Sequence, residues 1–533
     1  MDNKEILKFC FEKGCLLDQE ILKLFQEIED TETVKIMIEK IKNHTHQGVI
    51  TKKVFEENKE SVREFFLDLP KENQKNLEKL RIKLGLRIEI SQEVSRQIVE
   101  PLNKEEGEQV NSKRDFSNSD NSVRVVSMPP IISKKIEVGD FVKYFRNRLI
   151  NMRDYLQEHS ELNNLISIGK ISGERQGISL IGIVSDKRVT KNRNILLEIE
   201  DLTGKIRVLI NQNKPELYEK AEELALDSVA GIKGSGNREI VFASDIIFPD
   251  SRLLNRKKSP EEELAVFSGD MHIGSKFFME NNFLKFIDYL NGGIPNTPEV
   301  SKIKYFFIIG DLIAGVGIFP GQEMELNIPD VEGQYEKAAE LLKKIRKDIT
   351  IIISPGNHDA VRIMEPQPLL DERYAWSIYD LKNVILTNNP ALINIGAKAN
   401  FSGFNVLTYH GYSFHYYADR IPKLMKEKAI HKPEMLMHYL LKHRHLAPTH
   451  SSTLYFPSEE DSHLINTIPD IFVSGHTHKS SVTYYNNILT ISSSSWESLT
   501  PFQEKMGNEP DFCKVPMFNL KTREVKILDF EGE

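Results

Sequence analysis

Five apolar runs in the second half of the chain each end in a short polar motif. The runs with their motifs read AVFSGDMH, YFFIIGD, ITIIISPGNHD, NVLTYHG and IFVSGHTH. Short apolar runs bounded by glycine predict buried strands, and open α/β sheets place their sites where the strands end. Each glycine beside a motif lets the backbone turn sharply there. The chain from about residue 262 onwards is therefore predicted to be an α/β domain with one composite site at its strand ends.

The strands of this domain alternate with amphipathic helices. The segment NNFLKFIDYL places four apolar residues on one face of a helix. The segment QYEKAAELLKKIRKD places five apolar residues on one face of a second helix. An apolar stripe with a period of 3.6 residues predicts a helix that packs one face on a sheet. The expected buried residues are Phe283, Phe286, Ile287 and Leu290 in the first helix and Tyr335, Ala338, Ala339, Leu342 and Ile345 in the second.

The polar motifs supply seven side chains that suit metal coordination. They are Asp270, His272, Asp311, Asn357, His410, His476 and His478. Carboxylates, imidazoles and an amide without a thiolate favour two borderline-to-hard divalent ions, such as Mn²⁺, Fe²⁺ or Zn²⁺, over a structural zinc. A single D-x-H or G-D at a strand end is a weak signal. All five motifs in order form a strong composite signal that chance rarely produces.

The chain before this domain divides into four segments by composition. Residues 1–70 alternate apolar periods with Lys and Glu, which predicts a helical domain, and residues 71–136 include a polar run that predicts a partly disordered linker. Residues 137–160 carry an apolar stripe and are expected to form a helix that docks on another element. Residues 161–255 contain about five short alternating strands, which predict a barrel of the oligonucleotide/oligosaccharide-binding (OB) type.

The sequence leaves the roles of the docking helix and the barrel open. The stripe of the helix consists of Phe141, Phe145, Leu149, Met152 and Leu156. Barrels of this type often bind single-stranded nucleic acid through basic and aromatic side chains. The strands here carry few aromatic residues, so a role in docking another protein is as well supported as nucleic-acid binding.

Composition excludes several classes of protein. A chain of 533 residues with 40% hydrophobic and 28% charged residues is multidomain and globular rather than fibrous or mostly disordered. Its net charge of -8 excludes strong whole-molecule attraction to nucleic acid or an anionic membrane, so any nucleic-acid contact is local. Three cysteines without a C-x-x-C pair exclude a zinc ribbon and indicate a reducing compartment. Without a secretory signal or an apolar run near the roughly 20 residues of a membrane helix, a cytoplasmic protein is expected.

The order of the motifs, D-x-H, G-D, G-N-H-D, H and G-H-x-H, resembles that of the calcineurin-like metallophosphoesterases. The resemblance covers about residues 262–500 and implies two β-sheets flanked by helices, in a domain expected to span residues 262–533. Four longer stretches resemble the small subunits of archaeal family D DNA polymerases. These stretches are residues 310–322, 355–368, 440–448 and 506–522. The preceding barrel, helix and linker are similar to the layout of that family.

The resemblance implies a role for each candidate residue. The metal ligands that it implies are Asp270, His272 and His478 for one ion, Asn357, His410 and His476 for the other, and Asp311 as a bridge. Asp311 and His358 would be the catalytic residues, with His358 as the general acid that protonates the leaving sugar oxygen. Arg362 would steady a substrate phosphate. The implied cofactors are two divalent ions, Mn²⁺ first, with Fe²⁺, Zn²⁺ and Mg²⁺ as alternatives.

The implied activity is a 3′→5′ exonuclease that removes mispaired nucleotides behind a polymerase. The implied partners are the large catalytic subunit of family D DNA polymerase, DNA with a single-stranded or mismatched 3′ end, and the sliding clamp. A non-catalytic scaffold subunit is the first alternative; eroded metal ligands would mark it, whereas all seven ligands and His358 are present here. A protein phosphatase or cyclic-nucleotide diesterase is the second alternative. The appended barrel and the GVGIFPGQ and EPQP stretches argue against it.

One residue departs from the family pattern. Ala314 stands three positions after Asp311, where many relatives carry an aspartate that hydrogen-bonds the catalytic histidine. A methyl group cannot orient an imidazole, so His358 is expected to have a less fixed ring and the exonuclease to be slow, unless Asp359 serves instead.

Several other residues are expected to lie outside the site. Five histidines lack a common face at ligand spacing and are expected on a solvated helix, where a functional role would mean contact with the DNA backbone; they are His431, His438, His443, His445 and His450. His415 is left unassigned. Phe502, Trp496 and Tyr374 are expected in the core rather than as platforms for base stacking.

Overall fold

The computed structural model describes residues 3–13, 15–18, 34–35, 38, 49–50, 123–129 and 135–532. The chain divides into two compact units, the first comprising Met1–Val110 with Glu372–Trp376 and the second Asn111–Asp371 with Ser377–Glu533. The described elements of the N-terminal segment are helix α1 (Asn3–Glu12) and the paired parallel strands β1 (Leu16–Leu17) and β2 (Val49–Ile50). The rest of the predicted N-terminal helical domain, and most of the predicted linker, lie outside the described residues.

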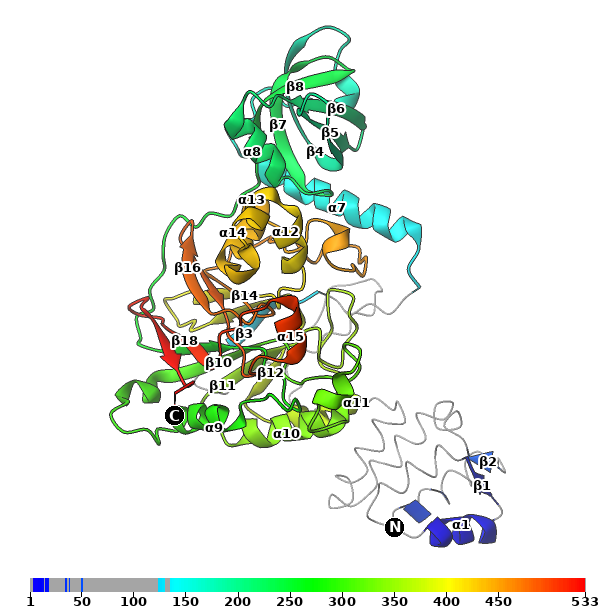
Figure 1. Ribbon diagram of the computed structural model, residues 1–533, viewed down its shortest axis with the longest axis vertical. Helices are drawn as coiled ribbons and strands as arrows, with labels where there is room; N and C mark the ends of the chain where they lie inside the picture. The colour runs from blue at the N-terminus through cyan, green and yellow to red at the C-terminus, as the bar shows by residue number, and fades with distance from the viewer. Residues whose placement is uncertain are drawn as a thin grey trace, which may run out of the picture. The chain divides into compact units, whose positions relative to one another are not determined.

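Five strands close into a barrel in the second unit (Figure 1), which confirms the predicted barrel. The strands are β4 (Gln176–Val189), β5 (Ile195–Asp201), β6 (Gly204–Ile210), β7 (Val229–Gly236) and β8 (Ile240–Ile247), with helix α8 (Pro215–Glu223) between β6 and β7. Successive side chains of a strand point to opposite faces, so Ile195, Leu197 and Ile199 of β5 all enter the barrel core.

Helix α7 (Val138–Gln157) docks on the barrel. Leu149, Met152 and Leu156 pack in one cluster with residues of β4, β7 and β8. These three residues belong to the predicted stripe, whereas the other two, Phe141 and Phe145, are only half-buried. The helix turns a second face toward the phosphoesterase-like domain that follows, which the apolar pattern alone does not reveal.

The second buried face of α7 carries a charge. Arg148 is 1% exposed, and its Nε donates to Asp461 Oδ2 at 2.6 Å. The same carboxylate oxygen lies 2.9 Å from His445 Nε2. Nearby, His463 Nε2 lies 3.0 Å from Glu365 Oε2. We call Arg148, Asp461, His445, His463 and Glu365 the sealed cluster, because all five side chains are buried.

Two six-stranded sheets form a sandwich with helices outside both sheets (Figure 1), as the resemblance implied. The first sheet contains, in spatial order, β12 (Val384–Leu386), β11 (Thr350–Ser354), β10 (Ile303–Ile309), β9 (Leu264–Ser268), β18 (Lys514–Asn519) and β19 (Val525–Asp529). The second contains β16 (Ser481–Tyr485), β17 (Ile488–Ser492), β15 (Ile471–Ser474), β14 (Phe404–Thr408), β13 (Ala391–Ile395) and β3 (Val123–Ser127).

The inner faces of the two sheets share one hydrophobic core. Phe267 and Phe307 of the first sheet stack with ring centroids 5.1 Å apart and belong to the same cluster as Ile393, Val406 and Ile491 of the second. Strands β9 and β11 are buried along their whole length. A parallel sheet covered on both faces demands such continuous apolar runs, which is why these strands read as uninterrupted hydrophobic segments.

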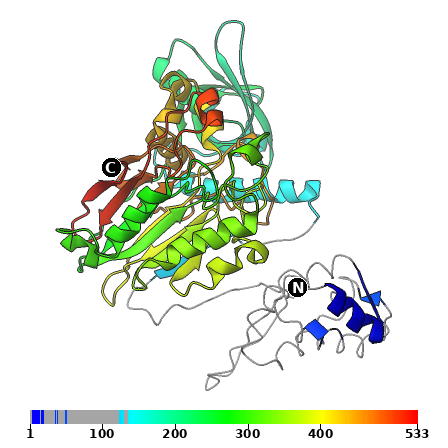
Figure 2. The ribbon, with the colours of Figure 1, turned by 60° about the horizontal axis from the view of Figure 1, so that its bottom comes forward.

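Helices cover the outer faces of the sandwich. Helices α9 (Glu280–Leu290) and α10 (Val331–Lys343) lie over the first sheet (Figure 2), and their predicted apolar faces are buried. The remaining α-helices that the structure describes are α11 (Glu372–Tyr379), α12 (Phe414–Arg420), α13 (Pro422–Lys426), α14 (Pro433–His443) and α15 (Pro501–Met506). Helices α12 and α14 pack against the second sheet. Among the described helices, none is long and apolar enough to cross a membrane.

Strand β3 lies within the predicted linker, which is a correction to that prediction. It pairs antiparallel with β13, with Val123 opposite Ile395 and Val125 opposite Ile393. Its five residues, VRVVS, follow directly on a polar run, and the partner strand is far away in sequence. Strand pairing with a distant segment leaves no local signal when the strand is short, so composition alone assigned these residues to the linker.

Two of the five histidines predicted on a solvated helix require another correction. His443 at the end of α14 and His445 just after it are buried, and His443 packs its ring 4.3 Å from that of Tyr439 and 5.0 Å from that of Phe248. Helix α14 contacts the second sheet on one side, and Tyr439 donates to the carbonyl of Glu223 in α8 on the other. A helix enclosed from two sides buries histidines that its charged sequence suggested were solvated.

Candidate metal centre

Side chains from five strand ends, taken from both sheets, converge at one edge of the sandwich. Asp270 and His272 follow β9, Asp311 follows β10, Asn357 and His358 follow β11, His410 follows β14, and His476 and His478 follow β15. The structure thus brings together all seven predicted ligands and the predicted general acid. This convergence follows from the sheet topology, because the strands that carry the motifs are neighbours in their sheets.

Five of the seven predicted ligands have a left-handed backbone. The φ angles are 48° at Asp270, 49° at His272, 47° at Asp311, 69° at His476 and 55° at His478. Such angles are uncommon for residues other than glycine and cost free energy, so they persist only where the surrounding structure holds them. This strain at the strand ends makes that edge of the domain a candidate functional site.

Two glycines allow the close approach of these side chains. A Cβ atom at Gly310 would collide with the ring of His410, and one at Gly356 would collide with the carboxylate of Asp311. Gly310 also has a φ of 75°, which side chains disfavour. Glycine is therefore required at these two motif positions.

One group of ligand atoms consists of those of Asp270, His272 and His478, which all lie within 4.8 Å of one another. His272 Nε2 and His478 Nε2 are 3.1 Å apart, and His478 Nε2 is 3.5 Å from Asp270 Oδ1. Two ring nitrogens and a carboxylate oxygen that face each other this closely suit a shared cation, since no proton arrangement satisfies all three as well.

A second group consists of Asp311, His410 and His476, whose ligand atoms also lie within 4.8 Å. His410 Nε2 is 3.3 Å from Asp311 Oδ2 and 2.9 Å from Asn357 Oδ1. Its other nitrogen, Nδ1, is 3.2 Å from the carbonyl oxygen of Ile309. That hydrogen bond fixes the tautomer, so Nε2 is left to face the oxygens of the cluster.

Asp311 stands between the two groups. Its Oδ2 lies 4.0 Å from His272 Nε2 on one side and 3.3 Å from His410 Nε2 on the other. The same oxygen is 4.0 Å from Nε2 of His358. A central carboxylate within reach of both groups has the position that the predicted bridge requires.

Burial and charge set the protonation of these groups. Burial, with His358 and His478 nearby, holds the pKa of His272 well below its usual range. Burial opposes the charged forms of Asp311 and His410 as well. The neighbouring imidazoles, His410 first, nevertheless hold the pKa of Asp311 well below its usual range. Asp311 in turn raises the pKa of His410 to about 10. Asp311 is therefore ionised and paired with His410 at neutral pH. A divalent cation between them would displace the imidazole proton.

The ring of His358 is held by the backbone of Ala314. Its Nδ1 is 2.8 Å from the Ala314 carbonyl oxygen, and its backbone N–H donates to Asp311 Oδ1 at 2.8 Å. The expectation of a less fixed ring is therefore wrong, because the acceptor is a main-chain oxygen. Asp359 does not take this role: its carboxylate accepts from the N–H of Gly356 at 2.9 Å.

Arg362 lies apart from the centre. Its Nη2 donates to the carbonyl of Pro366 at 2.7 Å, and its guanidinium lies 4.0 Å from the ring centroid of Phe456. It is not among the residues that line the cavity described next. The predicted contact with a substrate phosphate stays a prediction.

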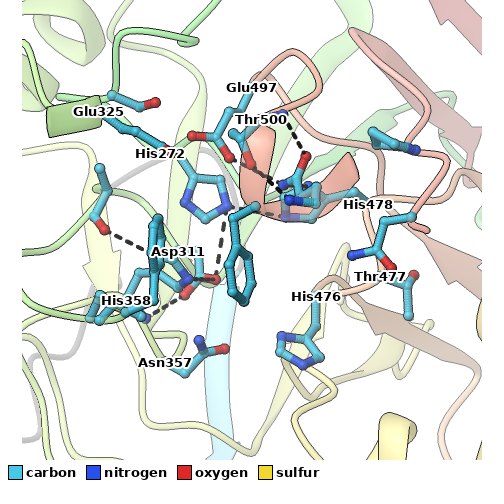
Figure 3. Close-up of a pocket in the computed structure, with 18 of the residues that line it drawn as sticks. His272, Asp311, Glu325, Asn357, His358, His476, Thr477, His478, Glu497 and Thr500 are labelled. Atoms are coloured by element: carbon cyan, nitrogen blue, oxygen red, sulfur yellow. Dashed lines mark hydrogen bonds and ion pairs between the residues drawn. The ribbon is translucent and has the colours of Figure 1, made fainter. Parts of the chain in front are cut away.

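A cavity of about 240 Å³ opens over the cluster. His272, Asp311, Asn357, His476 and His478 line it together with His358 (Figure 3). A small substrate group can therefore reach the predicted ligands and the predicted general acid at once.

Comparison with known proteins agrees with this geometry. The family of calcineurin-like phosphoesterases matches residues 265–480. The chain is 38% identical to the DNA polymerase II small subunit of Pyrococcus furiosus, over 75% of this chain and 65% of that protein. It is 36% identical to the DNA polymerase II small subunit of Methanothermobacter thermautotrophicus, over 74% of this chain and 80% of that protein. The chain belongs to the family of DNA polymerase II small subunits. This membership confirms the resemblance drawn from the motifs.

Two residues beside the candidate metal centre, Gln503 and Glu497, were not predicted from the sequence. Gln503 Nε2 lies 3.2 Å from His478 Nδ1 and donates to Glu497 Oε2 at 3.3 Å. Both residues come from the segment after β17, which has no ligand-type motif. Only the capping pattern T-P-F-Q, in which Thr500 accepts from the Gln503 N–H, signals that this segment is ordered.

Proposed function

We propose that this chain is the small subunit of a DNA polymerase and hydrolyses DNA phosphodiester bonds from the 3′ end as a proofreading exonuclease. One observation carries the proposal: all seven predicted ligands converge around Asp311, and five of them line a cavity together with His358. The names of the relatives support the polymerase part, and the phosphoesterase match supports hydrolysis. The proposed partners are a large catalytic subunit, DNA with a single-stranded or mismatched 3′ end, and the sliding clamp.

The proposed cofactors are two divalent ions, with Mn²⁺ foremost. The proposed ligands are Asp270, His272 and His478 for one, Asn357, His410 and His476 for the other, and Asp311 for both. The donor set fits such ions, because it combines imidazoles and oxygens without a thiolate. When bound, the ions would lower the pKa of a shared water and neutralise charge on the phosphate.

His358 would act on the leaving group. Because its Nδ1 donates to the Ala314 carbonyl, Nε2 is the atom that can deliver a proton to the 3′ oxygen of the departing strand. This Nε2 lies 4.0 Å from Asp311 Oδ2, so the atom that would deliver the proton faces the proposed metal centre. A positioned general acid of this kind contributes roughly 10²–10⁴-fold to the rate.

The test is the release of a labelled, mismatched 3′ nucleotide from a primer, measured with the full chain alone and with its large subunit. We expect release in Mn²⁺ and none in EDTA, and faster release from a mismatched than from a paired end. Metal content of protein purified without added metal is measured in parallel. Bound metal without release from any DNA would contradict the exonuclease, and absence of both would favour the scaffold alternative.

A further inference from the structure

An aromatic pair forms part of the wall of the metal-centre cavity. Phe319 comes from the loop after β10 and Phe502 from the start of α15, and both line the cavity together with the predicted ligands. The two rings stack with centroids 4.7 Å apart and an angle of 15° between their planes. Phe502 is 43% exposed, so the prediction that it lies in the core is wrong. An exposed aromatic face beside a polar site calls for an explanation in function.

The loop that carries Phe319 is anchored from below. The buried Gln322 accepts from the N–H of Ile318 at 2.9 Å and donates to the carbonyl of Ala314 at 2.8 Å. Gln334 of α10 accepts from the N–H of Gly315 at 2.9 Å. These hydrogen bonds hold the loop in one conformation, so the ring of Phe319 is presented by a rigid element.

The segment that carries Phe502 is anchored to the metal centre itself. Thr500 and Gln503 form a reciprocal capping pair around Phe502. The side chain of Gln503 also lies 3.2 Å from Nδ1 of His478, one of the predicted ligands. The aromatic pair therefore has a fixed position relative to the ligands, which is what a substrate-positioning surface needs.

The charges of the cavity indicate which part of a substrate this wall contacts. Glu325, Glu497 and Glu509 line the cavity, and no lysine or arginine is among the described residues that line it. Away from the proposed ions, which would hold the scissile phosphate, a phosphate of the DNA backbone would be repelled by these carboxylates. The uncharged face of a nucleobase would not be, and it stacks favourably on an aromatic ring whatever the base.

We propose that Phe319 and Phe502 form a stacking platform for the base of the unpaired 3′-terminal nucleotide. This proposal depends on the proposed exonuclease activity and describes how the enzyme holds its substrate. A base inside a duplex is already stacked on its neighbours, so only an unpaired terminal base can reach this surface without first being extruded. Stacking is indifferent to base identity, which matches removal of any mispaired nucleotide.

The experiment compares a short 5′-labelled oligothymidylate with the same oligomer whose 3′-terminal nucleotide is abasic. Dissociation constants are measured in EDTA by fluorescence anisotropy, and KM and kcat are measured in Mn²⁺. The variants are Phe502→Ala, Phe502→Leu and Phe502→Tyr in the full chain. Met324→Ala is the matched control, because Met324 is 76% exposed and is not among the residues that line the cavity.

Phe502→Ala is expected to raise the dissociation constant and KM for the normal oligomer about 5- to 100-fold, the usual worth of one base stacked on one aromatic ring. Phe502→Leu is expected to lose nearly as much, Phe502→Tyr and Met324→Ala to stay within about twofold, and kcat to change little. For the abasic oligomer, wild type and Phe502→Ala are expected to bind equally.

Three results would overturn the platform. The first two are unchanged binding by Phe502→Ala and equal losses on the normal and abasic oligomers. Full binding by Phe502→Leu would also overturn it, because apolar bulk would then suffice. The proposed function fails separately, when wild type in Mn²⁺ hydrolyses neither oligomer. Anisotropy in EDTA still decides the platform in that case.

Discussion

Two regions of the molecule are built from buried aspartates and histidines, and they differ in whether they contain their own cation. In the sealed cluster, Arg148 lies 2.6 Å from Asp461. Burial opposes ionisation there, but Arg148 holds the pKa of Asp461 well below its usual range. In the part of the chain that the structure describes, the candidate metal centre has no lysine or arginine lining its cavity, and that cavity is open to solutes. Similar side chains thus make a structural joint in one place and a candidate cation site in the other.

The two regions also differ in what they connect. The sealed cluster joins helix α7 to the segment after α14, and through Glu365 to the loop that follows Asn357 and His358. Tyr409, next to His410, completes this link with its hydroxyl 3.2 Å from Glu365 Oε2. Through these hydrogen bonds the sealed cluster supports the chain segments that carry His358 and His410. Damage to the first region is expected to change stability, and damage to the second to change activity.

The largest effect is expected from Asp311→Ala. Loss of the central carboxylate leaves the two proposed ions without a shared ligand, so hydrolysis should be abolished and bound metal should fall. Exonuclease rate and metal content are measured together under saturating Mn²⁺. Asp288→Ala, an exposed aspartate on α9, is the matched control and should behave as wild type. Retention of more than about a tenth of the wild-type rate would contradict the bridging role.

His358→Ala separates the proposed general acid from the ligands beside it. The rate is expected to fall roughly 10²–10⁴-fold while bound metal is unchanged, because His358 faces the cluster without completing either ligand set. Rates and metal content are again measured on the same preparation. An equal loss of metal would show that His358 is a ligand, which its place in a group with His272 and Asp311 makes a real alternative.

Arg148→Met tests the opposite behaviour of the sealed cluster. Removing the arginine leaves the buried Asp461 without its permanently charged partner, and the loss of one partner of a buried ion pair typically costs about 3–5 kcal/mol of unfolding free energy. Arg146→Met, on the exposed side of the same helix, is the control and should cost little. Urea unfolding measures both. A variant with unchanged stability, or one that loses metal while its stability is kept, would break the distinction between the two regions.

The smallest effect is a pH dependence that comes from His445. Burial, reinforced by Arg148, lowers its pKa to about 3, against an ordinary value of about 6.5. The unfolded chain therefore binds a proton that the folded chain does not, and stability falls as the pH drops from about 6.5 toward 3. Between pH 7 and pH 5 this residue contributes a loss of about 2 kcal/mol. His445→Gln in EDTA should flatten the fall, and an unchanged slope would contradict it.

Much of the fold could be predicted because its signals are local. The apolar faces of α9 and α10 and the alternation of β5 each lie within one short segment. Strand β3 was not predicted because its partner strand, β13, is far away in the sequence. The burial of His443 and His445 was not predicted for a similar reason. It depends on elements of the barrel domain and of the second sheet, which pack on α14 from two sides.

The composition of the site could be predicted more fully than its support. The converging residues could be predicted because side chains that can bind metals stand at strand ends. The group that orients His358 could not be predicted, because it is the main-chain carbonyl of Ala314, which every residue possesses. Gln503 and the exposed ring of Phe502 depend on where a loop returns to the cavity. Such returns are set by tertiary packing, which the sequence pattern does not display.

The most direct test of the comparison is a crystal of the full chain grown with Mn²⁺ and measured at an energy where manganese scatters anomalously. We expect two anomalous peaks between the side chains around Asp311 and none at the sealed cluster, where Arg148 already provides the positive charge. An anomalous map without peaks at Asp311, or with a peak beside Asp461, would contradict the account.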